Sequence, residues 1–495
     1  MAHSLSYRKT KIVATIGPAC WDVENLTQMV QSGLNVARLN FSHGTFAQHK
    51  TAVERIRKIS EELAAPVGIL QDLQGPKIRL KDFEGERAVK SGDSLILTDA
   101  NSSAKDKIKV DLKNLKDFVH VGQAIYIDDG IIELKVINVQ GEDIHCKVIH
   151  GGVLRPRKGV NLPDADIPID CLTKKDLKDL EMGVALGFDY VALSFVRDRS
   201  DIVKLKGLLK KWGSPARVIA KIEKKQAVEN IEAIIEESDG IMVARGDLSV
   251  EIGQVHLPTV QKRIIQICNR MGKPVITATQ MLDSMQVNSR PTRAEITDVA
   301  NAVWDGSDAL MLSGETAFGK YPVRSIQTMH EIISEVEKQP QIYHRFKYRK
   351  DSETTVPESI AISAVLCAKQ LKARTIVCLS TTGKTAQMIS KYRPKAKLVA
   401  VTAKSEALCK LELCWGVQTL KVAQYNNTED AIEKIEKLLL ENNIIKTGEN
   451  VVLTLGLPVA KGQTTNAVRV FTAGKNDEAL SSKPRAIRFF PKNKS

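Results

Sequence analysis

The sequence predicts an α/β protein whose largest part is a (β/α)₈, or TIM, barrel. Eight short runs rich in β-branched residues are apolar almost throughout rather than alternating, as strands buried on both faces are. Segments with helical periodicity separate most of these runs. Strand and helix in alternation, eight times over, are typical of a closed parallel barrel. The runs are residues 11–17, 35–42, 67–73, 189–195, 217–222, 240–247, 274–279 and 309–315.

Five of the intervening segments have the clearest helical pattern. Each of them lies between two predicted strands, or directly before one, which is where a barrel needs a connecting helix. These segments are residues 23–33, 49–63, 174–187, 226–238 and 257–272.

Two departures from the repeat predict further domains. Residues 74–160 lack a strong helical pattern and show short alternating segments between Gly and Asp turns, which predicts an inserted small β-barrel. An insertion over the mouth of a barrel suits a lid that excludes water. After the charged stretch HRFKYRKDSETT, strand and helix alternate again and predict an open α/β domain. We expect a discontinuous barrel of residues 1–73 and 161–345, a lid of residues 74–160 and a C-terminal domain of residues 346–495.

Composition favours an ordinary globular protein over a membrane or secreted one. The chain has 495 residues, 43% of them hydrophobic and 26% charged. No apolar stretch comes near the ~18 residues that a membrane span needs. The N-terminal segment has neither a signal core with a cleavage site nor a transit pattern. We therefore expect a cytoplasmic protein that does not bind membranes.

Cysteine and charge patterns point to small anionic substrates rather than to metal clusters or nucleic acid. The eight cysteines lie mostly in apolar runs and are expected to be reduced thiols. Cys409 and Cys414 lack the second pair or the His cluster of a zinc site. The formal net charge is +14, spread along the chain. The basic tail, residues 482–495, is interpreted as a solvated or interface terminus rather than a nucleic-acid arm.

Polar side chains gather at the carboxyl ends of the predicted strands. In a (β/α)₈ barrel all eight of these ends meet at one rim, where the active site lies. The residues concerned are therefore expected to surround one site. They are Arg38, Asn40, Ser42, Asp72, Ser194, Lys221, Glu223, Asp247, Thr279, Ser313 and Glu315.

Three of these residues form the most informative group. Lys221 and Glu223 are two apart at one strand end, so their side chains point to the same side. Asp247 ends the next run and is expected beside Glu223. Two carboxylates suit Mg²⁺, and an adjacent ammonium group could neutralise a transferring phosphoryl group. A structural ion pair on the barrel rim is the alternative.

Three further motifs carry weaker signals. The stretch ARGDLSVEIG predicts a tight Gly turn and a short helix whose free N–H groups could bind a carboxylate. Thr279 and the SGET run at 313–316 could organise water for proton delivery, although helix capping is the simpler explanation. His43 follows a strand and is more often structural than catalytic.

The run CLSTTGKT at 378–385 places hydroxyls, a Gly and a Lys between a predicted strand and a predicted helix. Cys378 stands where the first Gly of a P-loop belongs, which argues against an ATPase loop. A phosphate-binding turn of another kind is our interpretation, with an ordinary strand–helix loop as the alternative.

Taken together, these segments resemble the pyruvate kinase family over essentially the whole chain. The resemblance lies in long and specific motifs that occur in the expected order. It implies a barrel, an inserted lid and a C-terminal regulatory domain, in agreement with the three domains expected from the strand and helix pattern. The motifs are KIVATIGPA, GLNVARLNFSHG, QDLQGPKIR, IYIDDG, KGVNLP, AKIE, GIMVARGDL, ATQMLDSM, RPTRAE, DVANAVWDGSDALMLSGETA and GKYP.

The resemblance implies the last step of glycolysis, in which phosphate moves from phosphoenolpyruvate to ADP and the enolate is protonated to pyruvate. Carried over by motif, Arg38 and Lys221 would hold and stabilise the transferring phosphoryl group. Glu223 and Asp247 would bind the catalytic Mg²⁺ (or Mn²⁺).

The same resemblance assigns the substrate carboxylate and the proton. Gly246, Asp247 and Thr279 would contact the carboxylate of the substrate. Thr279, Ser313 and Glu315 would organise the water that protonates the enol carbon.

The nucleotide, ADP or ATP, would be bound by side chains of two separate parts of the sequence. The family motifs imply that Asn40, His43, Arg79 and Lys158 lie toward it. All the carried-over catalytic positions keep their side chains in this chain.

One position departs from the potassium-requiring members of the family. They carry Glu where this chain has Lys77. An ammonium group there could replace the K⁺ ion otherwise held near Asn40, Ser42, Asp72 and Leu73, so we expect an enzyme that does not require K⁺. A solvent-facing Lys77 is the alternative.

The resemblance also implies regulation and assembly. The turn Ser380, Thr381, Thr382, Gly383, Lys384 and Thr385 matches the place where allosteric members bind the phosphate of an effector, a sugar phosphate or a nucleotide. A homotetramer is implied as well.

Two rival functions remain open from the sequence. A Mg²⁺-dependent aldolase on the same barrel would share a Lys and acidic ligands but would not need so long a lid. A regulatory or nucleic-acid-binding protein on an inactive enzyme scaffold predicts lost catalytic side chains, whereas these are present.

Overall fold

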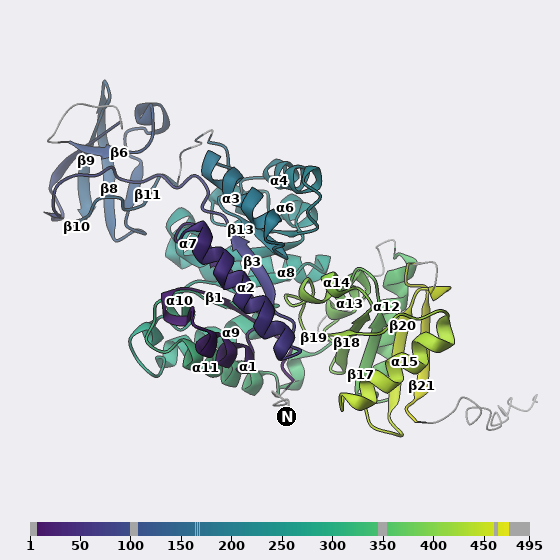
Figure 1. Ribbon diagram of the computed structural model, residues 1–495. Coiled ribbons are helices and arrows are strands. Elements are labelled where there is room, and N and C mark those ends of the chain that lie inside the picture. Colours follow the sequence, from purple (N-terminus) through teal and green to yellow (C-terminus); the bar gives the residue numbers. More distant parts are fainter. Residues whose placement is uncertain are drawn as a thin grey trace, which may run out of the picture. The chain divides into compact units, whose positions relative to one another are not determined.

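The computed structural model (Figure 1) describes residues 7–99, 107–163, 165, 167, 169–344, 354–459 and 464–474. The chain divides into two compact units. The first comprises Met1–Phe346 and Glu406–Val417, and the second comprises Lys347–Ser405 and Gln418–Ser495. The basic tail at 482–495 lies outside the described residues.

The first unit contains a closed barrel of eight parallel strands, which confirms the predicted fold. The order around the barrel is β1-β16-β15-β14-β13-β12-β3-β2, so each strand pairs with its predecessor and the last closes onto the first. The strands are β1 (Lys11–Thr15), β2 (Val36–Asn40), β3 (Gly68–Asp72), β12 (Tyr190–Leu193), β13 (Arg217–Ile222), β14 (Gly240–Ala244), β15 (Val275–Ala278) and β16 (Ala309–Leu312).

Helices follow the strands, and local capping residues begin several of them. Thr45, Thr173 and Thr292 each form a capping box in which side chains satisfy the first free N–H groups. The α-helices of this unit that lie before residue 345 are α1 (Val23–Gln31), α2 (Phe46–Glu62), α3 (Lys174–Ala185), α4 (Arg199–Lys211), α5 (Lys225–Glu229), α6 (Ile231–Glu237), α7 (Arg245–Ile252), α8 (Leu257–Met271), α9 (Arg293–Asp305), α10 (Gly314–Ala317) and α11 (Pro322–Val336). Short 3₁₀ helices are η1 (Pro18–Cys20), η2 (Leu115–Phe118), η3 (Gln254–His256), η4 (Asp283–Gln286) and η5 (Pro340–Ile342).

The helix predicted over 226–238 is two helices instead of one. Asn230 separates α5 from α6, with ψ of 15° rather than a helical value. Its side-chain amide donates to the carbonyl of Arg197 at 3.1 Å. Asn is a weak helix former because its side chain competes for such bonds.

Several predicted strands also end earlier than expected. The run 240–247 is β14 only as far as Ala244, and Asp247 lies in the first turn of α7. No tight Gly turn precedes that helix, since Gly246 is itself its second residue. Likewise Glu315 lies in α10 rather than in β16. These boundary errors have one cause: apolar residues continue from strand into helix, so hydrophobicity alone does not mark the change.

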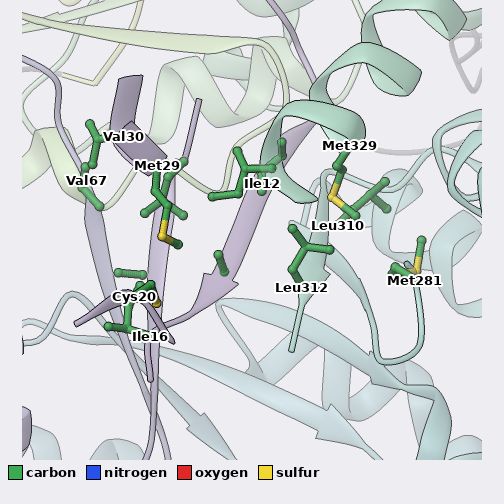
Figure 2. Close-up of a cluster of buried hydrophobic side chains, with 14 of the residues drawn as sticks. Ile12, Ile16, Cys20, Met29, Val30, Val67, Met281, Leu310, Leu312 and Met329 are labelled. Atoms are coloured by element: carbon green, nitrogen blue, oxygen red, sulfur yellow. The ribbon is translucent and has the colours of Figure 1, made fainter. Parts of the chain in front are cut away.

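The barrel is filled by side chains on its inside and covered by a second apolar layer outside. Interior residues such as Val13, Leu70 and Met242 alternate with outward-facing neighbours along each strand. Figure 2 shows part of the outer layer, in which Ile12 of β1 and Leu310 of β16 lie among methionines such as Met329 of α11.

Residues 406–417 form the floor of the barrel. Leu413 belongs to the interior cluster, and Tyr190 Oη donates to the carbonyl of Cys409 at 3.1 Å. Glu412 pairs with Lys11 at the start of β1 at 3.5 Å and accepts from Asn35 Nδ2 at 3.0 Å. Because these partners precede or begin the strands, the segment seals the amino-terminal end, opposite the predicted site. The sequence analysis did not anticipate it.

The inserted segment folds as a sheet that is nearly closed into a barrel. Residues Arg79 and Leu80 pair with Gly159, beside β11, and with Val110 of β6, so one short segment joins both edge strands. The six-stranded sheet has the order β11-β7-β8-β9-β5-β6, and β10 pairs separately with β4. The strands are β4 (Arg87–Val89), β5 (Ser94–Asp99), β6 (Ile108–Val110), β7 (Ala124–Ile127), β8 (Ile132–Gln140), β9 (Asp143–His150), β10 (Gly152–Leu154) and β11 (Val160–Asn161).

The second unit is the expected open α/β domain. Its sheet has the order β19-β18-β17-β20-β21, and β21 runs antiparallel to β20. Strand β19 and helix α14 were not predicted. The elements of this part of the chain are α12 (Val356–Gln370), β17 (Thr375–Leu379), α13 (Lys384–Ser390), β18 (Lys397–Thr402), α14 (Ser405–Cys409), β19 (Val417–Lys421), α15 (Thr428–Glu441), β20 (Asn450–Leu455) and β21 (Ala467–Thr472).

The thiol and membrane expectations can be compared with this structure. All eight cysteines are free thiols, six of them buried and two half-buried. Within the described residues, no group of three or more His, Cys, Asp and Glu side chains could hold a metal ion, and Cys409 and Cys414 belong to no such group. Among the described helices, none has both the length and the apolarity to cross a bilayer.

Candidate active site

A buried carboxylate at the end of β3 joins two cations. Asp72 Oδ2 accepts from Arg38 Nε at 2.7 Å, and Asp72 Oδ1 lies 3.2 Å from Lys221 Nζ. Burial by itself raises the pKa of Asp72, but Lys221 and Arg38 outweigh it and lower that pKa below its ordinary value. Two cations therefore face the barrel mouth in fixed positions, side by side.

Lys221 is held by three groups at the ends of β3, β12 and its own strand β13. Besides Asp72, its Nζ lies 2.9 Å from Glu223 Oε1 and donates to Ser194 Oγ at 2.7 Å. Burial lowers the pKa of Lys221, but the carboxylates of Asp72 and Glu223 more than offset this and raise it above its ordinary value. The ammonium group is thus charged at any physiological pH.

Glu223 and Asp247 form the expected carboxylate pair. Glu223 is buried, and burial followed by the nearby charge of Asp247 raises its pKa against the opposing effect of Lys221. Its Oε2 accepts from the backbone N–H of Phe195 at 2.7 Å. Two nearby carboxylates suit a divalent cation such as Mg²⁺, which takes one or two carboxylates and completes its shell with water and substrate.

Lys77 contacts Asp247, one member of this carboxylate pair, and Asp129. Its Nζ lies 3.3 Å from Asp247 Oδ1 and 3.8 Å from Asp129 Oδ1. The stem of the side chain crosses Gly159, where a Cβ atom would approach Lys77 Cε to 2.9 Å. Since its charge is paired and the side chain is only 25% exposed, the interpretation of Lys77 as a solvent-facing lysine is wrong.

Thr279 reaches the start of α7 through an unusual backbone bend. Its φ is +69°, a left-handed value that is rare for a β-branched residue. The hydroxyl accepts from the N–H of Gly246 at 3.0 Å and donates to the carbonyl of Ala278 at 2.7 Å. A hydroxyl and a helix N-terminus thus meet at one point, which suits an anionic group.

Glu315 is buried at the start of α10 beneath the same rim. It accepts from the backbone N–H groups of Leu282 at 3.0 Å and Ser313 at 2.7 Å. Burial raises its pKa, and these hydrogen bonds only partly oppose the effect. A carboxyl group with a raised pKa suits proton transfer.

The residues expected near the nucleotide lie in two regions of the first unit. Asn40 ends β2, and the exposed His43 follows it, with its carbonyl accepting from His49 Nε2 at 2.9 Å. Arg79 and Lys158 lie on paired segments of the inserted domain, where Lys158 Nζ contacts Asp128 Oδ1 at 2.9 Å.

Two contributors, Thr15 and Arg245, were absent from the predicted site, and Ser194 was expected at the rim without an assigned role. Thr15 Oγ1, at the end of β1, accepts from Arg38 at 2.8 Å, and Ser194 bonds Lys221 as described. Thr15 is a hydroxyl residue at a strand end, and that signal could have identified it. Arg245 contacts the backbone bend at Thr279. The sequence analysis did not single it out, because the RGD tripeptide that contains it carries little information by itself.

Comparison with known proteins decides the family. The family model described as the pyruvate kinase barrel domain matches residues 7–326, and that of the pyruvate kinase alpha/beta domain matches residues 358–471. The chain belongs to the pyruvate kinase family. It is therefore a kinase that transfers phosphate from phosphoenolpyruvate to ADP.

Individual pyruvate kinases are similar over most of their length. That of Geobacillus stearothermophilus is 43% identical, with 94% of this chain and 80% of that protein covered. That of Clostridium perfringens is 39% identical, with 94% and 99% covered. The crystal structure of a pyruvate kinase from Cryptosporidium parvum matches with a TM-score of 0.89 at 36% identity, covering 94% of this chain and 97% of the other.

The second unit, which contains most of the match to the alpha/beta domain of pyruvate kinase, has a pocket of its own. The pocket has a volume of about 260 Å³ and is lined by the 380–385 turn except Gly383, together with residues that include Tyr425 and Thr464. Gly383, with φ of +80°, is the N-cap residue before α13, and its N–H donates to Ser380 Oγ at 3.0 Å. Lys384 is exposed at the pocket.

Proposed function

We propose that the rim of the barrel carries out Mg²⁺-dependent phosphoryl transfer from phosphoenolpyruvate to ADP through Arg38, Lys221, Glu223 and Asp247. One observation supports this most directly: Asp72 holds Arg38 and Lys221 side by side, while Glu223 lies 2.9 Å from the same lysine. Phosphoryl transfer needs such positioned charges more than it needs covalent chemistry.

In the transfer step, the bond between phosphorus and the enol oxygen breaks and a β-phosphate oxygen of ADP forms the new bond to phosphorus. Negative charge spreads over the phosphoryl oxygens as this happens. Arg38 and Lys221 stabilise that charge, and they need no reorganisation because Asp72 already orients both.

Glu223 and Asp247 are proposed to hold the Mg²⁺ ion, or Mn²⁺ in its place. The donor set fits, because both groups are carboxylates. In this structure each carboxylate contacts a positive group, Glu223 that of Lys221 and Asp247 that of Lys77. When bound, the ion supplies positive charge to phosphoryl and substrate oxygens.

The remaining rim residues are proposed to hold the substrate and supply the proton. The backbone N–H groups of Gly246 and Asp247, with the hydroxyl of Thr279, bind the substrate carboxylate in place of the bond between Gly246 and Thr279. The enolate carbon then takes up a proton from water that Thr279, Ser313 and Glu315 orient. The raised pKa of Glu315 supports a part in this relay.

We further propose that K⁺ is not required. Three of the four candidate K⁺ ligands have oxygen atoms that contact protein donors: Asp72 contacts the two cations, Asn40 Oδ1 accepts from the Ser42 N–H at 3.1 Å, and the Leu73 carbonyl accepts from Ser194 Oγ at 2.7 Å. The ammonium group of Lys77 supplies a fixed charge beside Asp247 instead.

The lid, the nucleotide and the domain division form one part of the proposal. Residues 74–160 act as a lid on a barrel of residues 1–73 and 161–345, and ADP lies between Asn40 and His43 of the barrel and Arg79 and Lys158 of the lid. The two pairs of side chains occupy separate domains, so lid closure would complete the nucleotide site.

Regulation and setting complete the proposal. Residues 346–495 form a regulatory domain, and a phosphorylated effector, a sugar phosphate or a nucleotide, activates the enzyme from the pocket at residues 380–385. The hydroxyls and the exposed Lys384 of that pocket suit a phosphate group. The enzyme is proposed to be a cytoplasmic homotetramer.

An assay that couples pyruvate release and ATP formation to separate readouts tests the central claim. Wild-type protein should form both products from phosphoenolpyruvate and ADP, and chelation of Mg²⁺ should stop it. Lys221→Met should lower kcat by at least about 10²–10³-fold. The matched control Lys211→Met, at the exposed end of α4, should not change kcat. Wild-type protein that releases no ATP, or a fully active Lys221→Met variant, would refute the assignment.

A further inference from the structure

The bend at Thr279 and Gln280 needs a physical explanation of its own. These consecutive residues have φ values of +69° and +52°, which non-glycine residues rarely adopt. Ile276 and Ala278 face the barrel interior, while Thr277 Oγ1 bonds Ser307 outside it. Continued as a strand, the chain would turn Thr279 to the side of Thr277, away from the mouth. The left-handed bend therefore redirects its hydroxyl toward Gly246.

Arg245 supplies most of the bonds that hold this bend. Its Nε donates to the carbonyl of Ala278 at 3.1 Å, and Nη2 donates to the carbonyl of Thr279 at 2.6 Å. A longer contact of 3.4 Å reaches the carbonyl of Gln280, and Nη2 also lies 2.9 Å from Met281 Sδ. One guanidinium group thus binds three successive carbonyls of the bend.

Asp298 of α9 fixes the guanidinium group from the other side. Its Oδ1 accepts from Arg245 Nη1 at 2.8 Å and its Oδ2 lies 2.8 Å from Nη2, which is a two-point ion pair. The Arg245 side chain is only 11% exposed. Lysine could not reproduce this arrangement, because it offers a single ammonium group in place of a planar fork.

We propose that Arg245, oriented by Asp298, is a positioning residue that keeps Thr279 bent toward the substrate. It belongs to the first turn of α7, the same turn that presents the Gly246 N–H to the Thr279 hydroxyl. Arg245 is therefore linked to both partners of that hydrogen bond: Gly246 follows it in the chain, and its guanidinium group binds the carbonyl of Thr279. The catalytic consequence rests on the proposed role of Thr279 in substrate binding and protonation.

The experiment combines kinetics with a crystal structure. Arg245→Lys should lower kcat by about 10²-fold, the scale expected for misplacing a reacting group by about 1 Å. The rise in KM for phosphoenolpyruvate should be smaller, since Arg38 and Lys221 are untouched. In the crystal structure of the variant, φ of Thr279 should leave the positive region and its hydroxyl should move off Gly246.

Two matched variants keep the test decisive. Asp298→Asn leaves Arg245 in place and should lower kcat about tenfold, which decides the matter if Arg245→Lys does not fold. Arg270→Lys alters an exposed ion pair with Glu232 on the same barrel and should leave kcat unchanged. Wild-type kcat in both Arg245→Lys and Asp298→Asn, or an unaltered Thr279 bend in Arg245→Lys, would overturn the inference. If the wild-type protein forms no ATP, the proposed function fails instead, and the crystal structure still decides the role of Arg245.

Discussion

Arg38 donates from Nε to Asp72 Oδ2 at 2.7 Å, in a pair whose side chains are 11% and 2% exposed. Because Asp72 also contacts Lys221, this one carboxylate joins two half-buried cations. A charge in that position stabilises the fold and orients the site at the same time.

Asp72→Asn should therefore lower both the stability of the fold and the activity of the enzyme. Removing one partner of a buried ion pair leaves an uncompensated charge and costs about 3–5 kcal/mol. We expect a loss of that size in the free energy of unfolding, measured with urea, and a fall in kcat of the folded enzyme. The control Asp82→Asn breaks an exposed pair with Arg157 and should leave both quantities unchanged. Unaltered stability of Asp72→Asn would contradict the structure.

Glu315 should make stability fall as the pH rises. Burial raises its pKa in the folded protein, so folding favours the protonated form. Its contribution is complete below the unfolded pKa of about 4.5 and is lost as the pH rises through the folded pKa. The difference in unfolding free energy between wild type and Glu315→Gln should therefore shift in favour of the variant from pH 4.5 upward. Urea titrations at several pH values measure this, and Glu54→Gln on the exposed face of α2 should show no such trend.

Lys77 should decide the response to monovalent cations. Turnover of the wild type should persist when K⁺ is replaced by a bulky organic cation, and a collapse would contradict the proposal. Lys77→Met removes the charge 3.3 Å from Asp247 and should lower turnover about tenfold in the absence of K⁺, which corresponds to about 1.4 kcal/mol. Lys81→Met, which breaks an exposed pair with Asp111, serves as the control and should behave as wild type.

Lys384 should matter for the effector and not for the reaction. Lys384→Ala removes an exposed ammonium group from the pocket of the second unit and should weaken activation by a phosphorylated effector about tenfold, with maximal turnover unchanged. Titration of activity with sugar phosphates and nucleotides measures the shift. Lys369→Ala, near the exposed end of α12, should have no effect. Equal effector affinity in wild type and Lys384→Ala would reject this site.

The barrel could be predicted because its strands are buried on both faces. Runs such as β1 and β13 are apolar throughout, and the helices between them have a clear period, so the eight-fold alternation is visible in the sequence. Lys221 and Glu223 could be paired for the same reason, since a spacing of two residues fixes their common side.

Other features depend on contacts that the sequence does not display. The bend at Thr279 arises from bonds to Arg245, which is 34 residues away, and no local turn signal marks it. The position of Lys77 follows from the passage of its side chain over Gly159. Asp72 was assigned to a cation site by resemblance, whereas its two charged neighbours come from different strands.

The floor of the barrel, residues 406–417, has a consequence for how the protein is made. These residues emerge from the ribosome only after residues 347–405, which include β17 and β18 of the other unit. During synthesis the amino-terminal end of the barrel interior therefore stays uncovered until residues 347–405 of the second unit have been made. For the same reason, cutting the chain once near residue 346 separates the barrel from Leu413 and Glu412, so neither unit can be released whole by a single cleavage.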